Sequence, residues 1–357
     1  MQSSSAHIQP INKVRFTHML LRDQILDISR QNQIGAPSPF FSEQLDHQIS
    51  QGLFLPAENG LQRCEITEDL IGVKDSIINR LAAYREKTGA ATVVLGMSGG
   101  VDSAVTAALF KAAGWRVVGY ALPINQNPDE TARGIEMCQT LGIEYSVIDL
   151  TQAYHDLVQD IGKYDVDLIG AKTPLVQSEK IRLGNIRARL RMITLYNMAS
   201  KHGGIVASTD NFSELGAGFW TLHGDVGDVA PIQGLNKSWE VPMLAKMLNV
   251  PESTWRATPT DGLGISNGDE AQLGCSYLEW DLMVNWLFDS TDRDSSVEDA
   301  VAKLTDDRAI HVFNAVYGRM SKSWFKRLNP FNFDHPFLEN VETLSNFESR
   351  FTVPQGI

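Results

Sequence analysis

The chain has 357 residues, of which 43% are hydrophobic, so it can bury a substantial core in one large or two smaller domains. Its 43 acidic and 31 basic side chains give a formal net charge of -12, which argues against a nucleic-acid backbone as the main partner. Its three cysteines, Cys64, Cys138 and Cys275, lack the spacing of metal ligands, which argues against a zinc ribbon and a disulfide framework.

Residues 1–65 are the first segment along the chain. Residues 1–16 lack the apolar run of a signal peptide, and no stretch has the length and apolarity of a membrane span, so we expect a cytoplasmic protein. One short helix is predicted near residues 20–28, and the turn-rich sequence Gly-Ala-Pro-Ser-Pro follows at 35–39. These features predict an N-terminal appendage to the core, to which the sequence assigns no role.

Residues 66 to about 210 alternate between helical and strand patterns in the way that builds a parallel sheet. Helices are predicted at 67–89, 102–113, 129–141 and 181–202, and strands at 93–95, 116–122, 143–148 and 205–208, of which the first two are expected to be buried. Right-handed crossovers between such strands give an open, doubly wound sheet that binds ligands at the carboxyl ends of its strands.

Residues 279–317 are again helical in pattern, with a predicted buried face made of Trp280, Met283, Val284, Trp286 and Leu287. The expected fold class is therefore α/β, a doubly wound open parallel sheet with helical additions at both ends.

The segment 98–103, Ser-Gly-Gly-Val-Asp-Ser, joins the first predicted strand to the next helix. Gly99 and Gly100 permit close approach of a ligand, and the helix start presents backbone N–H groups and a positive dipole end to an anion. The segment is neither a Walker loop nor a Gly-x-Gly-x-x-Gly turn, and a plain turn before a helix is the alternative interpretation. It resembles the pyrophosphate loop (PP-loop) of the N-type ATP pyrophosphatases, which cleave ATP between its α and β phosphates to adenylate a substrate.

Two more segments follow in a specific order: Gly-Asn-Ile-Arg-Ala-Arg-Leu-Arg-Met at 184–192 and Ser-Thr-Asp-Asn-Phe-Ser-Glu at 208–214. With the loop, they resemble the NAD synthetases, which are N-type pyrophosphatases. The likeness covers roughly residues 66–330 and continues through 224–225, 231–232, 236–238, 259–260, 269–270, 273–277 and 323–327. It implies a sheet of the adenine nucleotide alpha hydrolase-like type in a domain at 66–335, between the appendage at 1–65 and a C-terminal tail at 336–357.

The resemblance implies a ligase of NAD biosynthesis that amidates deamido-NAD (nicotinic acid adenine dinucleotide) to NAD. Joining ammonia to a carboxylate needs a better leaving group than oxide, so the family first moves AMP from ATP to the nicotinate carboxylate and releases pyrophosphate. Ammonia then attacks the NAD-adenylate and AMP leaves. Positioning and charge neutralisation do most of this work. The resemblance also implies Mg2+ as cofactor, ATP as co-substrate and a homodimer that builds the deamido-NAD site across its interface.

The family's functional residues carry over to matched positions of this chain. Asp102 and Lys237 are the expected catalytic residues, and Asp102 and Glu214 the expected Mg2+ ligands, because hard carboxylate oxygens suit that ion. A helix cap is the alternative for Asp102 and a solvated acid for Glu214. The expected ATP-binding residues are Gly96, Met97, Ser98, Gly99, Gly100, Val101, Asp102, Ser103, Gln126, Thr209, Lys237 and Thr260.

The expected deamido-NAD-binding residues are Arg189, Asp228, Phe325 and Lys326. Arg187, Arg189 and Arg191 cannot share one helix face, so a solvated basic face is the alternative for some of them. Two positions depart from the family pattern, since Leu222 stands where many relatives carry Lys and Phe325 where His usually precedes the Lys. Lys326 and Arg327 keep the basic character, and His223 is a candidate to compensate for Leu222.

The source of nitrogen is expected to be free ammonia. Only about 65 residues precede the match, and a glutaminase domain with its own core and active site rarely fits in that length. Cys64 is the sole thiol there, so it is the sole candidate nucleophile for glutamine. A separate glutaminase partner stays open.

Two other functions also stay open. One is another adenylating N-type pyrophosphatase, such as a tRNA-modifying enzyme or the synthetase half of a guanylate-forming amidotransferase. The other is a non-catalytic nucleotide-binding regulator, which the changes at Leu222 and Phe325 allow and the retained Asp102, Glu214 and Lys237 oppose.

Overall fold

The computed structural model describes residues 21–30, 36–51, 55–57, 60–62, 66–164, 175–260, 262–263, 268–291 and 296–328. Cys64, residues 1–16 and the predicted tail at 336–357 lie outside the described residues.

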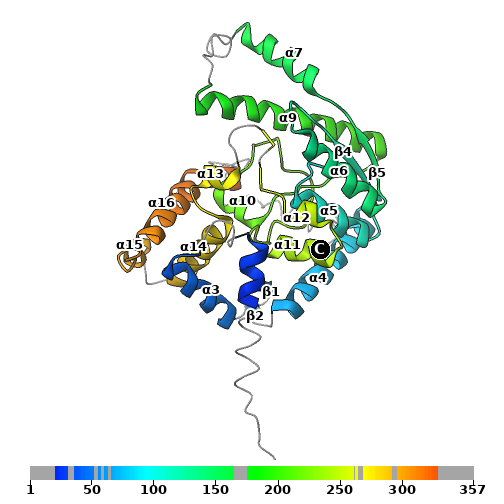
Figure 1. The fold of residues 1–357 in the computed structure, drawn as a ribbon. Helices are drawn as coiled ribbons and strands as arrows, with labels where there is room; N and C mark the ends of the chain where they lie inside the picture. Colours follow the sequence, from blue (N-terminus) through cyan, green and yellow to red (C-terminus); the bar gives the residue numbers. More distant parts are fainter. Residues whose placement is uncertain are drawn as a thin grey trace, which may run out of the picture.

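Four parallel strands form a sheet, of which β4 and β5 are labelled at the upper right of Figure 1. Its strands are β3 (Thr92–Gly96), β4 (Arg116–Ala121), β5 (Glu144–Val147) and β6 (Ile205–Val206), in the order β5-β4-β3-β6. The chain therefore moves outward from β3 to β5 and returns to the other side of β3 as β6. This reversal places a topological switch point between β3 and β6, and it confirms the predicted doubly wound sheet.

Helices cover both faces of this sheet, and each face has its own apolar core. On one face, α5 (Val101–Ala112) is buried along nearly its whole length and packs against α4 (Ile66–Thr88) and α11 (Glu240–Met247). On the other face, α9 (Gln177–His202) joins β3, β4 and β6 in a second apolar cluster that includes Val94, Val118, Met192, Leu195 and Val206. Two crossover helices complete this half, α6 (Pro128–Leu141) and α7 (Thr151–Gly162).

The predicted helices and strands of this half are confirmed, with small shifts at their ends. The helix predicted from 181 begins earlier, at Gln177. Glu179 Oε2 accepts from the Val176 N–H at 2.9 Å, which caps the start of the helix at this position. The strand predicted at 205–208 has only two residues. α7, at the top of Figure 1, lies in a segment for which no helix is predicted above.

The second half of the chain adds helices beside the sheet. The region predicted as helical at 279–317 divides into α14 (Tyr277–Ser290), α15 (Val297–Val301) and the start of α16 (Asp307–Lys322). Trp280, Met283, Val284 and Leu287 are buried as predicted, and Trp286 is partly buried. Four short helices complete this half, α10 (Phe212–Ala217), α12 (Glu252–Trp255), α13 (Asp269–Leu273) and α17 (Trp324–Arg327).

The described part of the N-terminal appendage packs into the main core. A helix at 21–28, dark blue in Figure 1, buries Ile25, and α3 (Pro39–Gln51) buries Phe41. Phe40 meets Trp286 of α14 edge to face, with ring centroids 5.6 Å apart. A two-stranded antiparallel hairpin of β1 (Leu55–Ala57) and β2 (Gly60–Gln62) follows.

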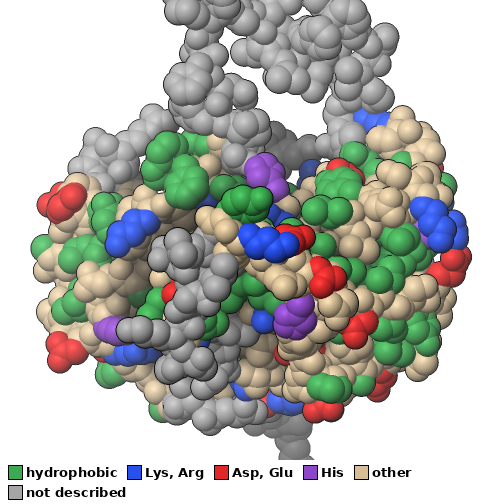
Figure 2. Space-filling view, turned by 90° about the horizontal axis from the view of Figure 1, so that it is seen from above, with side chains coloured by type: hydrophobic (Ala, Val, Ile, Leu, Met, Phe, Trp, Pro, Cys, Tyr) green, Lys and Arg blue, Asp and Glu red, His purple; other side chains and the backbone are tan. Residues whose placement is uncertain are grey.

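The described residues include no helix long and apolar enough to cross a bilayer. On the face shown in Figure 2, Lys and Arg side chains of the described part stand among Asp and Glu side chains rather than in one continuous basic band.

Candidate active site

The loop between β3 and α5 has a geometry that only glycine permits. Gly99 has a positive φ of 83°, and a Cβ on it would lie 2.1 Å from the carbonyl oxygen of Glu130. The Ser98 hydroxyl accepts from the Gly100 N–H at 3.2 Å and lies 3.2 Å from the Ser103 hydroxyl. These contacts join the two ends of the loop to each other. The loop therefore follows the edge of α6 closely and opens toward the carboxyl end of the sheet.

The first turn of α5 has no side-chain cap. Its N-cap residue is Gly100, which offers no side-chain oxygen, so the backbone N–H groups of this turn have no capping side chain. Asp102 lies in that first turn rather than at the cap, so the cap interpretation of Asp102 is wrong. The bare helix start is an arrangement suited to an anion.

A cavity of about 610 Å³ opens in front of this loop, at the carboxyl ends of the strands. Every residue expected to bind ATP lines it, from Gly96 through Ser103 and including Gln126, Thr209, Lys237 and Thr260. One wall of the cavity is the segment 254–260, of which Thr254, Ala257, Thr258, Pro259 and Thr260 face the cavity. The structure thus gathers residues from many separate stretches of the chain around one space.

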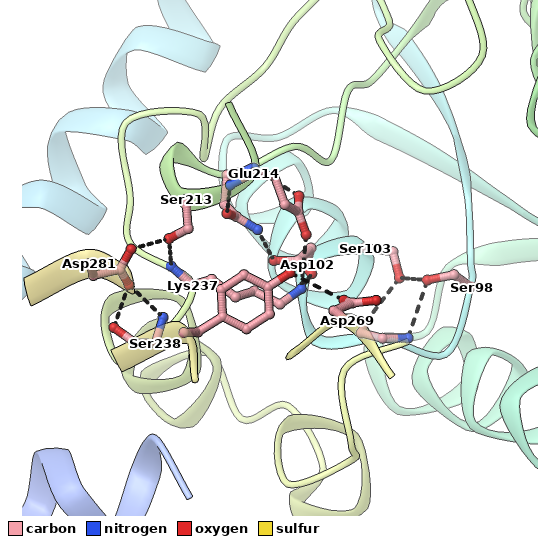
Figure 3. A network of polar contacts seen from close by, with 12 residues as sticks. Ser98, Asp102, Ser103, Ser213, Glu214, Lys237, Ser238, Asp269 and Asp281 are labelled. Carbon is pink, nitrogen blue, oxygen red and sulfur yellow. Dashed lines mark hydrogen bonds and ion pairs between the residues drawn. The ribbon is translucent and has the colours of Figure 1, made fainter. Parts of the chain in front are cut away.

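Lys237 lies at the centre of the polar cluster in this cavity (Figure 3). Its ammonium is paired with Asp102 Oδ2, and its Nζ lies 3.2 Å from Glu214 Oε1. Asn211 donates to Asp102 Oδ1 at 3.1 Å and also forms the N-cap of α10, where it exchanges hydrogen bonds with Glu214. Only 8% of the Lys237 side chain is exposed, so little water screens these charges.

Burial and charge together set the protonation of this cluster. Burial lowers the pKa of Lys237, but Asp102 and Glu214 outweigh it and hold that pKa above its ordinary value. Burial raises the pKa of Glu214 to about 8, against the pull of Lys237. Burial also raises the pKa of Asp210, which lines the cavity, to about 7. The carboxyl groups here outnumber the lysine, so the cluster is suited to accept a further cation.

A second set of buried groups holds the backbone around Lys237, at the left of Figure 3. The Lys237 N–H donates to Ser213 Oγ at 2.9 Å, and Ser213 donates to Asp281 Oδ1 at 2.6 Å. Ser238 donates its hydroxyl and its N–H to Asp281 Oδ2, at 2.5 and 3.2 Å. Asp281 comes from α14 and is 3% exposed, so it ties a distant helix to the lysine.

Asp281, Asp269 and Tyr277 lie near Lys237 but received no site role from the sequence, although 269–270 and 273–277 belong to the family likeness. The Lys237 Nζ is 5.7 Å from the centre of the Tyr277 ring, and the Tyr277 hydroxyl donates to Asp269 Oδ2 at 3.2 Å. The available signal was the placement of Glu279 and Asp281 in the otherwise apolar start of α14, where a buried charge needs a partner.

Of the arginines on α9, Arg191 faces the cavity, whereas Arg189, the one expected to bind deamido-NAD, does not. Arg191 lines the cavity, donating to the Leu122 carbonyl at 3.0 Å and to Gln126 Oε1 at 3.3 Å. Arg189 points to another side of α9, is exposed, and donates to the Leu222 carbonyl at 3.2 Å. Within one chain, Arg189 is therefore outside the cavity, because residues two apart on a helix face different ways.

Two more residues expected to bind deamido-NAD also lie outside the cavity. The Asp228 carboxylate accepts from the Val206 N–H at 2.8 Å and from the Tyr196 hydroxyl at 2.9 Å, which ties it to the edge of the sheet. Asp225 lines the cavity instead, accepting from the Thr221 N–H at 2.6 Å. Phe325 is exposed on α17 and borders a neighbouring pocket that shares Gly218 and Lys326 with this cavity.

Lys326 is the member of the expected deamido-NAD set that lines the cavity. Its ammonium donates to the carbonyls of Gly218, at 2.7 Å, and Trp220, and burial lowers its pKa. Leu222 and His223 are not among the residues that line the cavity, and the Leu222 carbonyl lies beside Arg189 instead.

Comparison with known proteins gives consistent results. Residues 73–330 match a family model described as NAD synthase. The NH(3)-dependent NAD(+) synthetase of Methanocaldococcus jannaschii is 37% identical over 218 residues, which cover 59% of this chain and 80% of the relative. That of Thermococcus kodakarensis is 37% identical over 207 residues, 57% of this chain and 75% of the relative.

Two solved structures have the same fold over most of this chain. The NMN synthetase from Francisella tularensis superposes with a TM-score of 0.61 at 26% identity, covering 75% of this chain and 99% of that one. The NH3-dependent NAD synthetase from Campylobacter jejuni superposes with a TM-score of 0.56 at 25% identity, covering 74% and 99%.

Proposed function

This chain belongs to the NAD synthase family, and we propose that it is a ligase that amidates deamido-NAD to NAD with ATP and ammonia. The observation that carries the proposal is the convergence of the uncapped α5 start, Asp102, Lys237 and Glu214 on one cavity at the switch point of the sheet.

The loop and Lys237 suit the first step of this reaction. An oxygen of the nicotinate carboxylate attacks the α-phosphorus of ATP, the bond to the β-phosphate oxygen breaks, and pyrophosphate leaves with that electron pair. The N–H groups of the uncapped α5 start and the buried ammonium stabilise negative charge that grows on the leaving phosphates. In the second step, ammonia attacks the acyl carbon of the adenylate, the bond from that carbon to the AMP oxygen breaks, AMP leaves, and the nitrogen loses one proton to water and keeps two hydrogens in the amide.

We propose that Asp102 and Glu214 hold Mg2+ when ATP is bound. Both carboxylates already converge on one positive charge, the Lys237 ammonium, so their oxygens are placed to share a cation. The described residues contain no group of three His, Cys, Asp or Glu side chains able to hold a metal alone, so ATP phosphate oxygens would complete the shell, as Mg2+ commonly requires. When bound, the ion neutralises phosphate charge.

The deamido-NAD site is proposed to include a second copy of this chain. Arg189, Ile193 and Tyr196 recur along one face of α9, where Ile193 is 66% and Tyr196 41% exposed. The Tyr196 hydroxyl bonds Asp228, so two of the expected deamido-NAD residues lie on this exposed face rather than in the cavity. A homodimer that buries the α9 face would bring Arg189 and Asp228 toward a substrate shared between copies.

The likeness to the NMN synthetase from Francisella tularensis favours a second candidate, amidation of the corresponding mononucleotide by the same chemistry. Pyrophosphate release from ATP in the presence of either acid separates the two. We expect release that depends on deamido-NAD and is much slower with nicotinic acid mononucleotide. Faster release with nicotinic acid mononucleotide than with deamido-NAD would support the second candidate. If neither acid leads to pyrophosphate release, the chain is a non-catalytic regulator.

A further inference from the structure

The helix at 21–28 and the residues after it lie outside the family match at 73–330, yet they touch the wall of the ATP cavity. We propose that this N-terminal segment, residues 21–30, positions the wall segment 254–260 for ATP, with Asp27 and Arg30 as the positioning residues. The inference rests on the proposed function in so far as ATP is the ligand of the cavity.

Apolar burial anchors the N-terminal segment to the main core. Ile25, Leu26 and Ile28 are 1%, 7% and 4% exposed, and all three belong to the same apolar cluster as α5 and α14. The helix backbone is therefore held in place by burial, and the polar side chains that contact the wall extend from this held backbone.

Three side-chain contacts join the segment to the wall. The Asp27 carboxylate accepts from both terminal nitrogens of Arg256, at 3.3 and 3.0 Å, in a two-pronged pair. The Arg256 guanidinium lies 4.6 Å from the centre of the Trp255 ring, which fixes its plane. Arg30 donates to Thr258 Oγ1 at 3.1 Å, and Thr258 itself lines the cavity.

The wall needs such support because residues 256–260 have no regular secondary structure after the short α12. On the other side of the wall, Thr260 donates to Glu130 Oε1 at 2.9 Å, and the Glu130 carbonyl lies against Gly99 of the loop. The wall is thus held between α6 and the N-terminal segment. Loss of either contact would widen the set of positions that Thr258 and Thr260 occupy before ATP arrives.

The expected effect is modest, since the side chains of Arg256 and Asp27 are 35% and 54% exposed and water screens their attraction. We expect Asp27→Ala and Arg30→Ala to weaken ATP binding two- to five-fold each. The turnover number should change less than the KM for ATP, because neither residue touches the reacting atoms.

The N-terminal region offers a matched control. Arg22 pairs with Asp46 at 2.9 Å and donates to Ser42, both in α3, so Arg22→Ala removes an ion pair without touching the wall. Hydrogen exchange of the full chain should become faster in peptides from 254–260 in Asp27→Ala and Arg30→Ala, and stay unchanged there in Arg22→Ala. Asp27→Glu should restore wild-type exchange and ATP affinity.

Unchanged exchange at 254–260 in both variants would overturn the inference, and so would the same change in Arg22→Ala, which would indicate general loosening. Titration with ATP and Mg2+ keeps the two proposals apart. A wild-type chain that bound no ATP would refute the proposed function, while the exchange measurement would still decide whether the segment positions the wall.

Discussion

At the residue scale, the ATP cavity combines a contiguous loop with side chains that folding brings in from distant elements. The loop at 98–103 is local, so its motif located one side of the ATP cavity directly. Asp281 reaches the site from α14 through Ser213 and Ser238, and no spacing in the sequence announces that contact. The periodicity of α9 showed that Arg189 and Arg191 face different ways, but not which of them faces the cavity.

Asp102→Asn and Glu214→Gln each remove one negative charge at nearly constant shape. We expect turnover to fall on the order of 100-fold in each variant, because a buried charge at the reacting phosphates is lost. The measurement is the turnover number over a Mg2+ titration. Asp129→Asn, on the exposed first turn of α6, is the matched control and should retain full activity. Near-normal turnover in both site variants would refute the proposed metal ligands.

Asp281→Asn tests the support behind Lys237. An amide accepts fewer hydrogen bonds than the carboxylate that now accepts three, so Ser213 and Ser238 lose part of their anchor. We expect turnover to fall about ten-fold, with a smaller change in the KM for deamido-NAD, since a charge-assisted bond contributes about 1.5–3 kcal/mol. Steady-state kinetics and thermal unfolding, measured together, check this. A lower unfolding temperature with unchanged turnover would show that Asp281 serves stability alone.

At the scale of elements, buried runs predicted the strands and the helices that flank them. β3 and β4 are continuous apolar stretches, so the sequence identifies them without tertiary information. α7 was missed although its apolar residues recur at helical spacing, so the sequence carried a signal for this helix that was not used; they are Tyr154, Leu157, Val158 and Ile161. β5 was predicted although its residues are exposed at the sheet edge. Gly142 ends the preceding helix, and the apolar residues Ile143 and Ile148 stand on either side of the strand.

Gly99→Ala tests whether the loop depends on its close approach to α6. A methyl group there would lie 2.1 Å from the Glu130 carbonyl oxygen, so the loop must move away and ATP binding should be lost. Gly203→Ala is the matched control, because Gly203 also has a positive φ, of 61°, but no atom lies within 4 Å of its added methyl. The control should lose only about 1–2 kcal/mol of stability. Equal ATP affinity in both variants would contradict this account of the loop.

Glu240, at the start of α11, gives the turn around Lys237 a pH dependence. It accepts from the Asn236 N–H at 2.6 Å and is 4% exposed, and burial raises its pKa to about 8. The folded state therefore favours protonated Glu240 more than the unfolded state does. The contribution of this group to the free energy of unfolding is fully present below about pH 4.5 and is lost as the pH rises through 8.

Glu240→Gln is neutral at every pH, so the free energy of unfolding of the variant should rise relative to wild type between pH 5 and pH 8. The expected difference is on the order of a few kcal/mol. Denaturant unfolding at each pH measures it. A constant difference across that range would show that Glu240 does not titrate as its burial implies.

At the scale of the whole molecule, the N-terminal region is where the sequence said least. A short helix near residues 20–28 was predicted, but its contacts with the ATP wall depend on Arg256 and Thr258, more than 200 positions later.

The two described thiols, Cys138 and Cys275, argue against glutamine as the nitrogen donor. Cys138 and Cys275 are buried, and burial raises the pKa of each to about 12, so neither is a ready nucleophile.

The measurement that tests the central claim most directly is incorporation of nitrogen from isotopically labelled ammonium into NAD. Purified full chain is mixed with ATP, Mg2+, deamido-NAD and labelled ammonium, and the products are weighed by mass spectrometry. We expect NAD carrying one labelled nitrogen, with one AMP and one pyrophosphate formed for each NAD, and none of these products from Lys237→Ala. Formation of AMP and pyrophosphate without labelled NAD, or labelled NAD at wild-type rate from Lys237→Ala, would contradict it.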